Sequence, residues 1–216
     1  GRRPIESDRD AIASLQHDER PDIKVAKVDD FGKLNLLIIG DFRKENANAA
    51  LSVAQVLNID KKKAEKSIRN FKGIKRRLEY KGKINEAKFY DDYAVVPITV
   101  KATINALAEK FKDKKMLLVL EPHTFSRVKT FFDAFIKSIK SSKINQVFIT
   151  DVYPAREKGN VKVLSIKLAK AIGKKAKFTG SMEKTANVLS QNLNKYEIVC
   201  SMGAGDSYKL YDLIKH

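Results

Sequence analysis

The chain has 216 residues, of which 43% are apolar and 32% are charged. This apolar content is enough to bury a core, so composition excludes intrinsic disorder, a collagen-like fibre and a disulfide scaffold. No run approaches the roughly 18 consecutive apolar residues that a membrane span needs, and the first residues lack the apolar stretch of a signal peptide. The single Cys200 has apolar flanks, which predict a buried, unreactive thiol in a reducing cytoplasm.

The charge balance is strongly basic. Lys and Arg number 43 against 26 Asp and Glu, which gives a net charge of +17. Such an excess makes a polyanion a plausible partner, whether nucleic acid, a nucleotide or a phosphorylated substrate. The lysines are spread along the chain, however, and blocks of this kind are usually solvated helix faces. Charge alone therefore leaves the function open.

The amino-terminal third has its own pattern. Residues 1–22 are polar and patternless, which predicts a loop. Two apolar runs separated by a polar turn then predict a hairpin, and apolar residues at helical spacing predict two helices. In chain order, the expected elements are a hairpin of residues 22–28 and 33–40, a helix over Glu45–Leu57, and a helix that Asp60 caps, that reaches Phe71 and that Gly73 ends.

From about residue 74 the pattern alternates between short apolar runs and stretches of helical period. This alternation is typical of βα units around a parallel sheet, so we expect one α/β domain up to the C-terminus. The expected strands are 76–82, 87–93, 115–122, 146–150, 175–179 and 197–203. The expected helices are 97–112, 125–141, 163–172, 183–193 and a last one from residue 207.

Ligands of open α/β sheets bind beyond the carboxyl ends of the strands. Asp91, Asp92 and Tyr93 follow one expected strand, where paired carboxylates could hold ribose hydroxyls or magnesium, or could cap the next helix. His123 follows the most apolar strand with Arg127 four residues later, a spacing that suits an anion-binding pair or a structural histidine.

Two further strand ends carry weaker signals. Residues 151–159, in which Pro154 fixes a turn, are expected to form a solvent loop. The glycines of 202–206 predict close packing of a strand against the following helix, because Tyr208 stands where a dinucleotide fingerprint needs its third glycine. The sequence contains no P-loop, CxxC, HExxH or GxSxG motif, so zinc chemistry and serine hydrolysis have no candidate site.

Six segments, taken in this order, resemble the C-terminal half of the Mur ligases. They are GDFRKENANAA (40–50), FKGIKRRLEY (71–80), FYDDYAVVPITVKATINAL (89–107), LEPHTFSR (120–127), DVYPAREK (151–158) and MGAGD (202–206). The resemblance covers about residues 34–216. It implies a Rossmann-like C-terminal domain over 71–216, with a mainly parallel sheet flanked by helices. Residues 1–70 would be a loop followed by the tail of the central ATPase domain, in either a cut piece or a naturally shortened paralogue.

The resemblance also implies a reaction. Within the family, the motifs are most similar to the ligases that join L-alanine to UDP-N-acetylmuramate in peptidoglycan synthesis. ATP would activate the muramyl carboxylate as an acyl phosphate for attack by the amine, with Mg²⁺ neutralising phosphate charge. The P-loop and most magnesium ligands belong to a part of the central domain that this chain does not contain. We therefore expect no catalytic residue and no metal ligand here, and no amide bond from this polypeptide alone.

Site residues follow from the resemblance position by position. The implied nucleotide contacts are Asn46, Arg77 and Asp92, and the implied amino-acid contacts are Tyr93, His123 and Arg127, with Arg127 pairing with the substrate carboxylate.

The chain also departs from the family pattern. Val95 and Val96 replace two histidines, which leaves the choice of amino acid open, and Phe42 and Arg43 replace a His-Asn pair at the adenine site. A muramyl-tripeptide recycling ligase and a basic nucleic-acid-binding module are the alternatives.

Overall fold

A computed structural model describes residues 27–32, 34–40 and 42–215. At its centre is a six-stranded sheet in the order β1-β2-β6-β3-β4-β5. Every neighbouring pair is parallel except β1 and β2, which are antiparallel. The strands are β1 (Glu79–Ile84), β2 (Ala87–Asp92), β3 (Met116–Leu120), β4 (Gln146–Thr150), β5 (Ala176–Gly180) and β6 (Ile198–Met202). The expected α/β fold with a mainly parallel sheet is confirmed.

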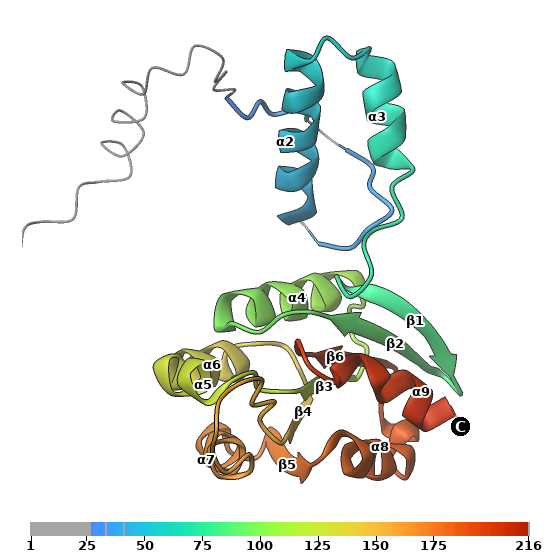
Figure 1. The fold of residues 1–216 in the computed structure, drawn as a ribbon. Coiled ribbons are helices and arrows are strands. Elements are labelled where there is room, and N and C mark those ends of the chain that lie inside the picture. The colour runs from blue at the N-terminus through green and yellow to red at the C-terminus, as the bar shows by residue number, and fades with distance from the viewer. Residues whose placement is uncertain (1–26, 33, 41, 216) are drawn as a thin grey trace, which may run out of the picture.

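Helices cover both faces of this sheet (Figure 1). One apolar cluster joins the strands to α4, α6 and α7, and a second joins them to α8 and α9. Strand β3 is buried along its whole length, as expected of a central strand covered on both faces. The helices of this domain are α4 (Pro97–Lys110), α5 (Phe125–Thr130), α6 (Phe132–Lys140), α7 (Val163–Ile172), α8 (Met182–Ser190) and α9 (Leu210–Lys215), with short 3₁₀ turns at Leu193–Lys195 and Ser207–Lys209.

The last strand is inserted into the middle of the sheet. Strand β6 lies between β2 and β3, and its Met202 is in register with Asp92 on one side and Leu120 on the other. The carboxyl ends of three strands therefore meet at one edge. The chain leaves β3 toward α5 and α6 and leaves β6 toward α9. Because α6 and α9 pack on opposite faces of the sheet, this edge is a topological switch point.

Helices α2 (Phe42–Val56) and α3 (Lys61–Arg69) lie together, apart from the sheet (Figure 1). They pack on a small apolar cluster that includes Leu34 and Leu51. The Asp60 side chain accepts a hydrogen bond from the Lys63 backbone N–H at 2.9 Å, which confirms the expected cap. The helix ends at Arg69 rather than at Phe71, and Gly73 follows in the connecting segment.

The expected hairpin is wrong where it can be checked. Residues 27–32 and 34–40 form no strand, while residues 22–26 and 33, like the expected loop of residues 1–22, lie outside the described residues. Two backbone donors of this segment bond to side chains of α2 instead of to a second strand: Asp29 N–H to Ser52 Oγ at 2.9 Å and Phe31 N–H to Asn48 Oδ1 at 3.4 Å.

Two helices also differ from expectation. The helix expected over 125–141 is divided at Phe131, whose φ of −107° and ψ of 19° end α5 before α6 begins. The last helix starts as a 3₁₀ turn at Ser207 and becomes α-helical only at Leu210.

Cys200 is 1% exposed on β6, and burial, with Asp92 and Asp91 nearby, raises the pKa of its thiol. This confirms the expectation of a buried, unreactive cysteine. None of the helices in the described part of the chain is long and apolar enough to cross a membrane.

Candidate functional site

Asp91 and Asp92 point to opposite faces of the sheet, because successive residues of a strand alternate. Asp91 is fully buried and accepts hydrogen bonds from Arg76 Nε at 3.2 Å and Ser201 Oγ at 3.1 Å. Asp92 is 5% exposed, and its Oδ2 accepts from Thr103 Oγ1 of α4 at 3.4 Å. The two carboxylates therefore cannot act together on one ribose or one metal ion.

Neither carboxylate caps α4. The N-cap position is Val96, and Thr99 Oγ1 accepts a hydrogen bond from its backbone N–H at 3.4 Å. The helix-capping alternative for the Asp91-Asp92 pair is thus wrong. Burial raises the pKa of both carboxyls, opposed mainly by Arg76 at Asp91 and by Arg43 at Asp92.

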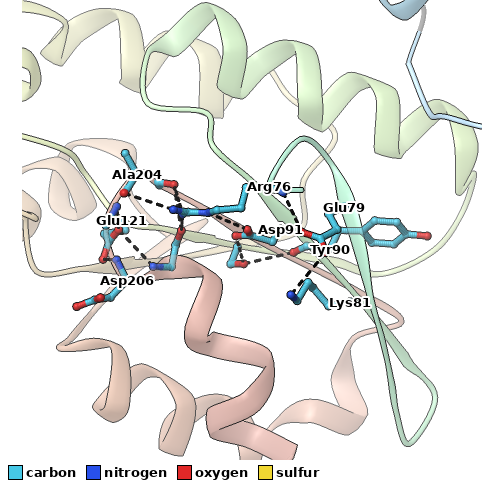
Figure 2. Close-up of polar contacts among 12 residues, drawn as sticks. Arg76, Glu79, Lys81, Tyr90, Asp91, Glu121, Ala204 and Asp206 are labelled. Atoms are coloured by element: carbon cyan, nitrogen blue, oxygen red, sulfur yellow. Dashed lines mark hydrogen bonds and ion pairs between the residues drawn. The ribbon is translucent and has the colours of Figure 1, made fainter. Parts of the chain in front are cut away.

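Arg76 ties the edge of the sheet to the loop that follows β6. Its Nη2 donates to Gly203 O at 2.8 Å and to Ser207 Oγ at 3.1 Å, while Nε binds Asp91. Figure 2 shows this guanidinium lying between Asp91 and Ala204. The sequence reasoning missed Arg76, which lies beside the predicted Arg77. Its backbone φ of 58°, which turns the side chain toward the loop, left no pattern in the sequence.

Glu121, the residue directly after β3, holds the same loop. Its carboxylate is 5% exposed and accepts hydrogen bonds from the backbone N–H groups of Gly205 and Asp206 at 2.9 Å and of Ser207 at 3.3 Å. A Cβ at position 203 would lie 2.7 Å from Glu121 Oε2, so only glycine fits there. The glycines of 202–206 do allow a close approach, but Gly203 packs against Glu121 beyond β3 rather than against the following helix, which was the expected partner. A carboxylate directly after the most apolar strand was the available signal for Glu121.

Tyr93 lies against two guanidinium groups. Its ring centroid is 5.0 Å from Arg76 Cζ and 5.4 Å from Arg77 Cζ, within the range of cation–π attraction. Arg76 also lies 4.8 Å from the ring centroid of Tyr208. The structure thus brings the predicted Arg77, Asp92 and Tyr93 together at the end of β2, and half-exposed Tyr93 is available to a ligand.

Arg43 connects α2 to this edge. It is 8% exposed and donates through Nη2 to the Arg77 carbonyl oxygen at 2.7 Å. Burial lowers the pKa of Arg43, with Asp92 acting in the opposite direction. The predicted Asn46 is exposed one turn further along α2, and among the described residues no hydrogen bond links it to Arg77 or Asp92. Arg43, noted in the sequence only as a departure, is the α2 residue that reaches the site.

His123 and Arg127 form the second predicted group. Arg127 Nη1 lies 2.6 Å from His123 Nδ1. A guanidinium has only donors, so Nδ1 accepts and the imidazole is neutral with its proton on Nε2. Burial and the adjacent Arg127 lower the pKa of His123, which agrees with the neutral form. The imidazole thus orients Arg127 through Nη1 and does not engage the other N–H groups of the guanidinium.

The segment between them is strained. Thr124 has a φ of 61° and a ψ of 143°, a conformation that β-branched residues rarely adopt. Its side chain accepts a hydrogen bond from Arg127 N–H at 3.4 Å, which starts α5 at the point where Arg127 projects. Strain of this kind is common where a side chain must be aimed at a ligand.

The solvent loop expected over 151–159 is only partly found. The Tyr153 ring stacks on His123, with centroids 5.6 Å apart and an interplanar angle of 18°. Val152 is buried, and Glu157 accepts hydrogen bonds from the backbone and hydroxyl of Ser126 at the start of α5. The Tyr153 ring can lie there because position 205 is glycine, where a Cβ would collide with it. The sequence reasoning missed Tyr153.

Within residues 27–32, 34–40 and 42–215, no group of three or more His, Cys, Asp or Glu side chains could hold a metal ion. Because the described residues do not fit a metal centre, we assign no magnesium ligand and derive no step through magnesium.

Comparison with known proteins gives the family. The Mur ligase glutamate ligase domain matches residues 76–205, which is more than half of the chain. The chain belongs to the Mur ligase family. Within this family it is similar to the UDP-N-acetylmuramate–L-alanine ligase of Caldicellulosiruptor saccharolyticus, with 40% identity over 84% of this chain and 40% of the relative. The enzyme of the same name from Alkaliphilus metalliredigens is 36% identical over 85% of this chain and 40% of the relative.

A solved Mur ligase structure has the same fold. The UDP-N-acetylmuramate-alanine ligase of Thermotoga maritima superimposes with a TM-score of 0.68 at 22% identity, over 83% of this chain and 38% of that chain. This chain thus spans about two fifths of the length of the curated relatives that it matches.

Proposed function

We propose that this chain is the C-terminal part of a cytoplasmic, ATP-dependent ligase that joins L-alanine to UDP-N-acetylmuramate in peptidoglycan synthesis. The observation that carries the proposal is the 36–40% identity to relatives of that name over 84–85% of this chain. Residues 71–216 would be the C-terminal domain, and residues before 71 the tail of the central ATPase domain. The polypeptide alone would form no amide bond.

Arg127 is proposed to bind the carboxylate of the amino acid. A guanidinium presents a planar set of donors that matches a carboxylate in two-pronged geometry, which leaves the amine free to attack. His123 is proposed to line the same pocket and to hold the guanidinium in place, since its Nδ1 accepts from Nη1 at 2.6 Å. Tyr93, half-exposed at the neighbouring strand end, would form another wall of the pocket.

Arg77, Asp92 and Asn46 are proposed to contact the nucleotide. The Asp92 carboxylate is a hydrogen-bond acceptor for ribose hydroxyls, and Arg77 supplies positive charge beside it. Arg43 would position this group, because it binds the Arg77 carbonyl oxygen and faces Asp92. In this proposal ATP would supply the phosphate that activates the muramyl carboxylate, and the residues of this chain would bind and orient the nucleotide and the amino acid.

A chimera tests the proposal. Residues 34–216 would replace the matching part of the Caldicellulosiruptor saccharolyticus relative, and ADP release would be measured with UDP-N-acetylmuramate and L-alanine, L-serine or glycine. We expect release that depends on L-alanine. Arg127→Ala should raise the half-saturating alanine concentration by about tenfold or more, equivalent to about 1.4 kcal/mol, whereas Arg156→Ala, in an exposed loop arginine, should not. A folded chimera that releases no ADP with any of the three amino acids would contradict the proposal.

A further inference from the structure

A cavity of about 460 Å³ lies where the α2–α3 unit meets the sheet. Its walls come from residues 37–39, from the connecting segment 72–75, from the start of β1 and from the end of α4. Figure 1 shows the two connecting segments passing between the helices and the sheet, and a Cβ on Gly73 would lie 3.2 Å from Ile38 Cγ2. The cavity is therefore at the junction of the two units.

The lining of this junction cavity is cationic. Lys72, Lys75, Arg77 and Lys110 all contribute to it, and all four are exposed. Of its described lining residues only Glu79 is acidic. Its Oε2 accepts from Arg76 N–H at 2.8 Å and its Oε1 lies 3.7 Å from Lys81 Nζ, so its charge is already matched by other groups. Four like charges around one cavity repel one another, and an anion placed among them would relieve that repulsion.

Aromatic and apolar groups lie beside these cations. Tyr80 is 53% exposed, and its ring centroid is 5.4 Å from that of the buried Tyr90. Ile38 and Leu78 complete an apolar wall. An exposed ring next to lysines suits a planar base that carries phosphates, because the base stacks while the ammonium groups hold the phosphates.

We propose that the junction cavity binds a diphosphate group, either free or carried by a nucleoside, with Lys72 and Lys75 as its principal charges. This site goes beyond the proposed function: neither Asp92 nor Tyr93 lines it, and Arg77 is the only residue shared with the nucleotide contacts proposed above. A bound diphosphate joins the segment 72–75 to α4, and so fixes the α2–α3 unit relative to the sheet.

Calorimetric titration of the chain with inorganic pyrophosphate and with ADP, at about 0.15 M salt to screen long-range charge, tests this site. The double variant Lys72→Ala/Lys75→Ala is compared with Lys167→Ala/Lys170→Ala, which removes the same charge from exposed positions on α7. We expect the cavity variant to weaken pyrophosphate binding by at least about tenfold and the α7 variant by less than about twofold. Thermal unfolding of both variants checks that they are folded.

Tyr80→Ala distinguishes the two sources of the diphosphate. A loss of ADP affinity with unchanged pyrophosphate affinity assigns the site to a nucleoside diphosphate, and unchanged affinity for both assigns it to free diphosphate. Absence of pyrophosphate binding to the unaltered chain, or equal losses in the two lysine variants, would overturn the proposal. The chimera's alanine dependence does not involve Lys72 or Lys75, so failure of this site leaves the proposed function standing.

Discussion

Replacing Glu121 should test the loop after β6 most directly. Its carboxylate is 5% exposed and accepts three backbone N–H groups, from Gly205, Asp206 and Ser207. Glu121→Ala removes the acceptor for all three donors. A buried donor without a partner costs about 1–3 kcal/mol, and water entering the vacated space would offset part of that cost. Taking the lower end for each donor, we expect the free energy of unfolding to fall by about 3 kcal/mol.

Urea unfolding followed by far-ultraviolet circular dichroism measures this loss, since the chain contains no tryptophan to report by fluorescence. With a urea dependence of about 2 kcal/mol per molar, 3 kcal/mol moves the midpoint down by about 1.5 M. Glu121→Gln keeps one carbonyl oxygen and should lose about half as much.

Asp206→Asn is the matched control. It lies in the same loop, but its side chain is 48% exposed and pairs with Lys209, which is 46% exposed. Its replacement should therefore leave the urea midpoint almost unchanged. Equal midpoint shifts for Glu121→Ala and Asp206→Asn would refute the reasoning, because burial of the three hydrogen bonds would then make no difference.

Three further results are expected. Burial and Arg127 lower the pKa of His123 in the folded chain. As the pH falls, the unfolded chain therefore binds a proton on this histidine before the folded chain does, and stability should decrease below about pH 6.5. His123→Gln should weaken this pH dependence of the thermal unfolding temperature. Thr124→Gly should be more stable than Thr124→Ala by about 1–2 kcal/mol, because both lose the hydroxyl cap and only glycine combines a φ of 61° with a ψ of 143° without strain. Equal stability of the two variants would argue against strain. Burial raises the pKa of Tyr90 to about 12. Ultraviolet titration should therefore find one tyrosine that ionises last, and this late step should be absent in Tyr90→Phe. Because the tyrosine ionises at about pH 10 in the unfolded chain, stability should be lost between about pH 10 and about pH 12.

The regular elements of the sheet could be predicted because their signals are local. Residues 146–150 and 163–172 alternate from an apolar run to a helical period, and the structure has β4 and α7 at those bounds. The hairpin could not be predicted in the same way. Residues 34–40 are apolar enough for a strand, but Leu34 packs with α2 and α3, and Ile39 packs on the cluster that includes α4. Only tertiary structure decides between a strand and this packing.

The residues of the candidate site that lie at or just after strand ends could be predicted from the sequence. Asp92, His123 and Arg127 follow strands whose carboxyl ends meet at one edge, so a parallel sheet is enough to gather them. The side chains that fix this edge were not predictable, because Arg76 and Tyr153 reach it through loops. A backbone φ of 58° and a missing Cβ at Gly205 place these two residues, and neither leaves a periodic signal.

Because Cys200 is buried, the native chain should hardly react with thiol reagents. The only cysteine is 1% exposed, and burial raises its pKa, so a maleimide or a spin label should leave it untouched. Two cysteines introduced on the surface would then be the only points of attachment. Dyes attached to cysteines on α3 and α8 could report the distance between the two helices, and Cys200 would not have to be replaced first.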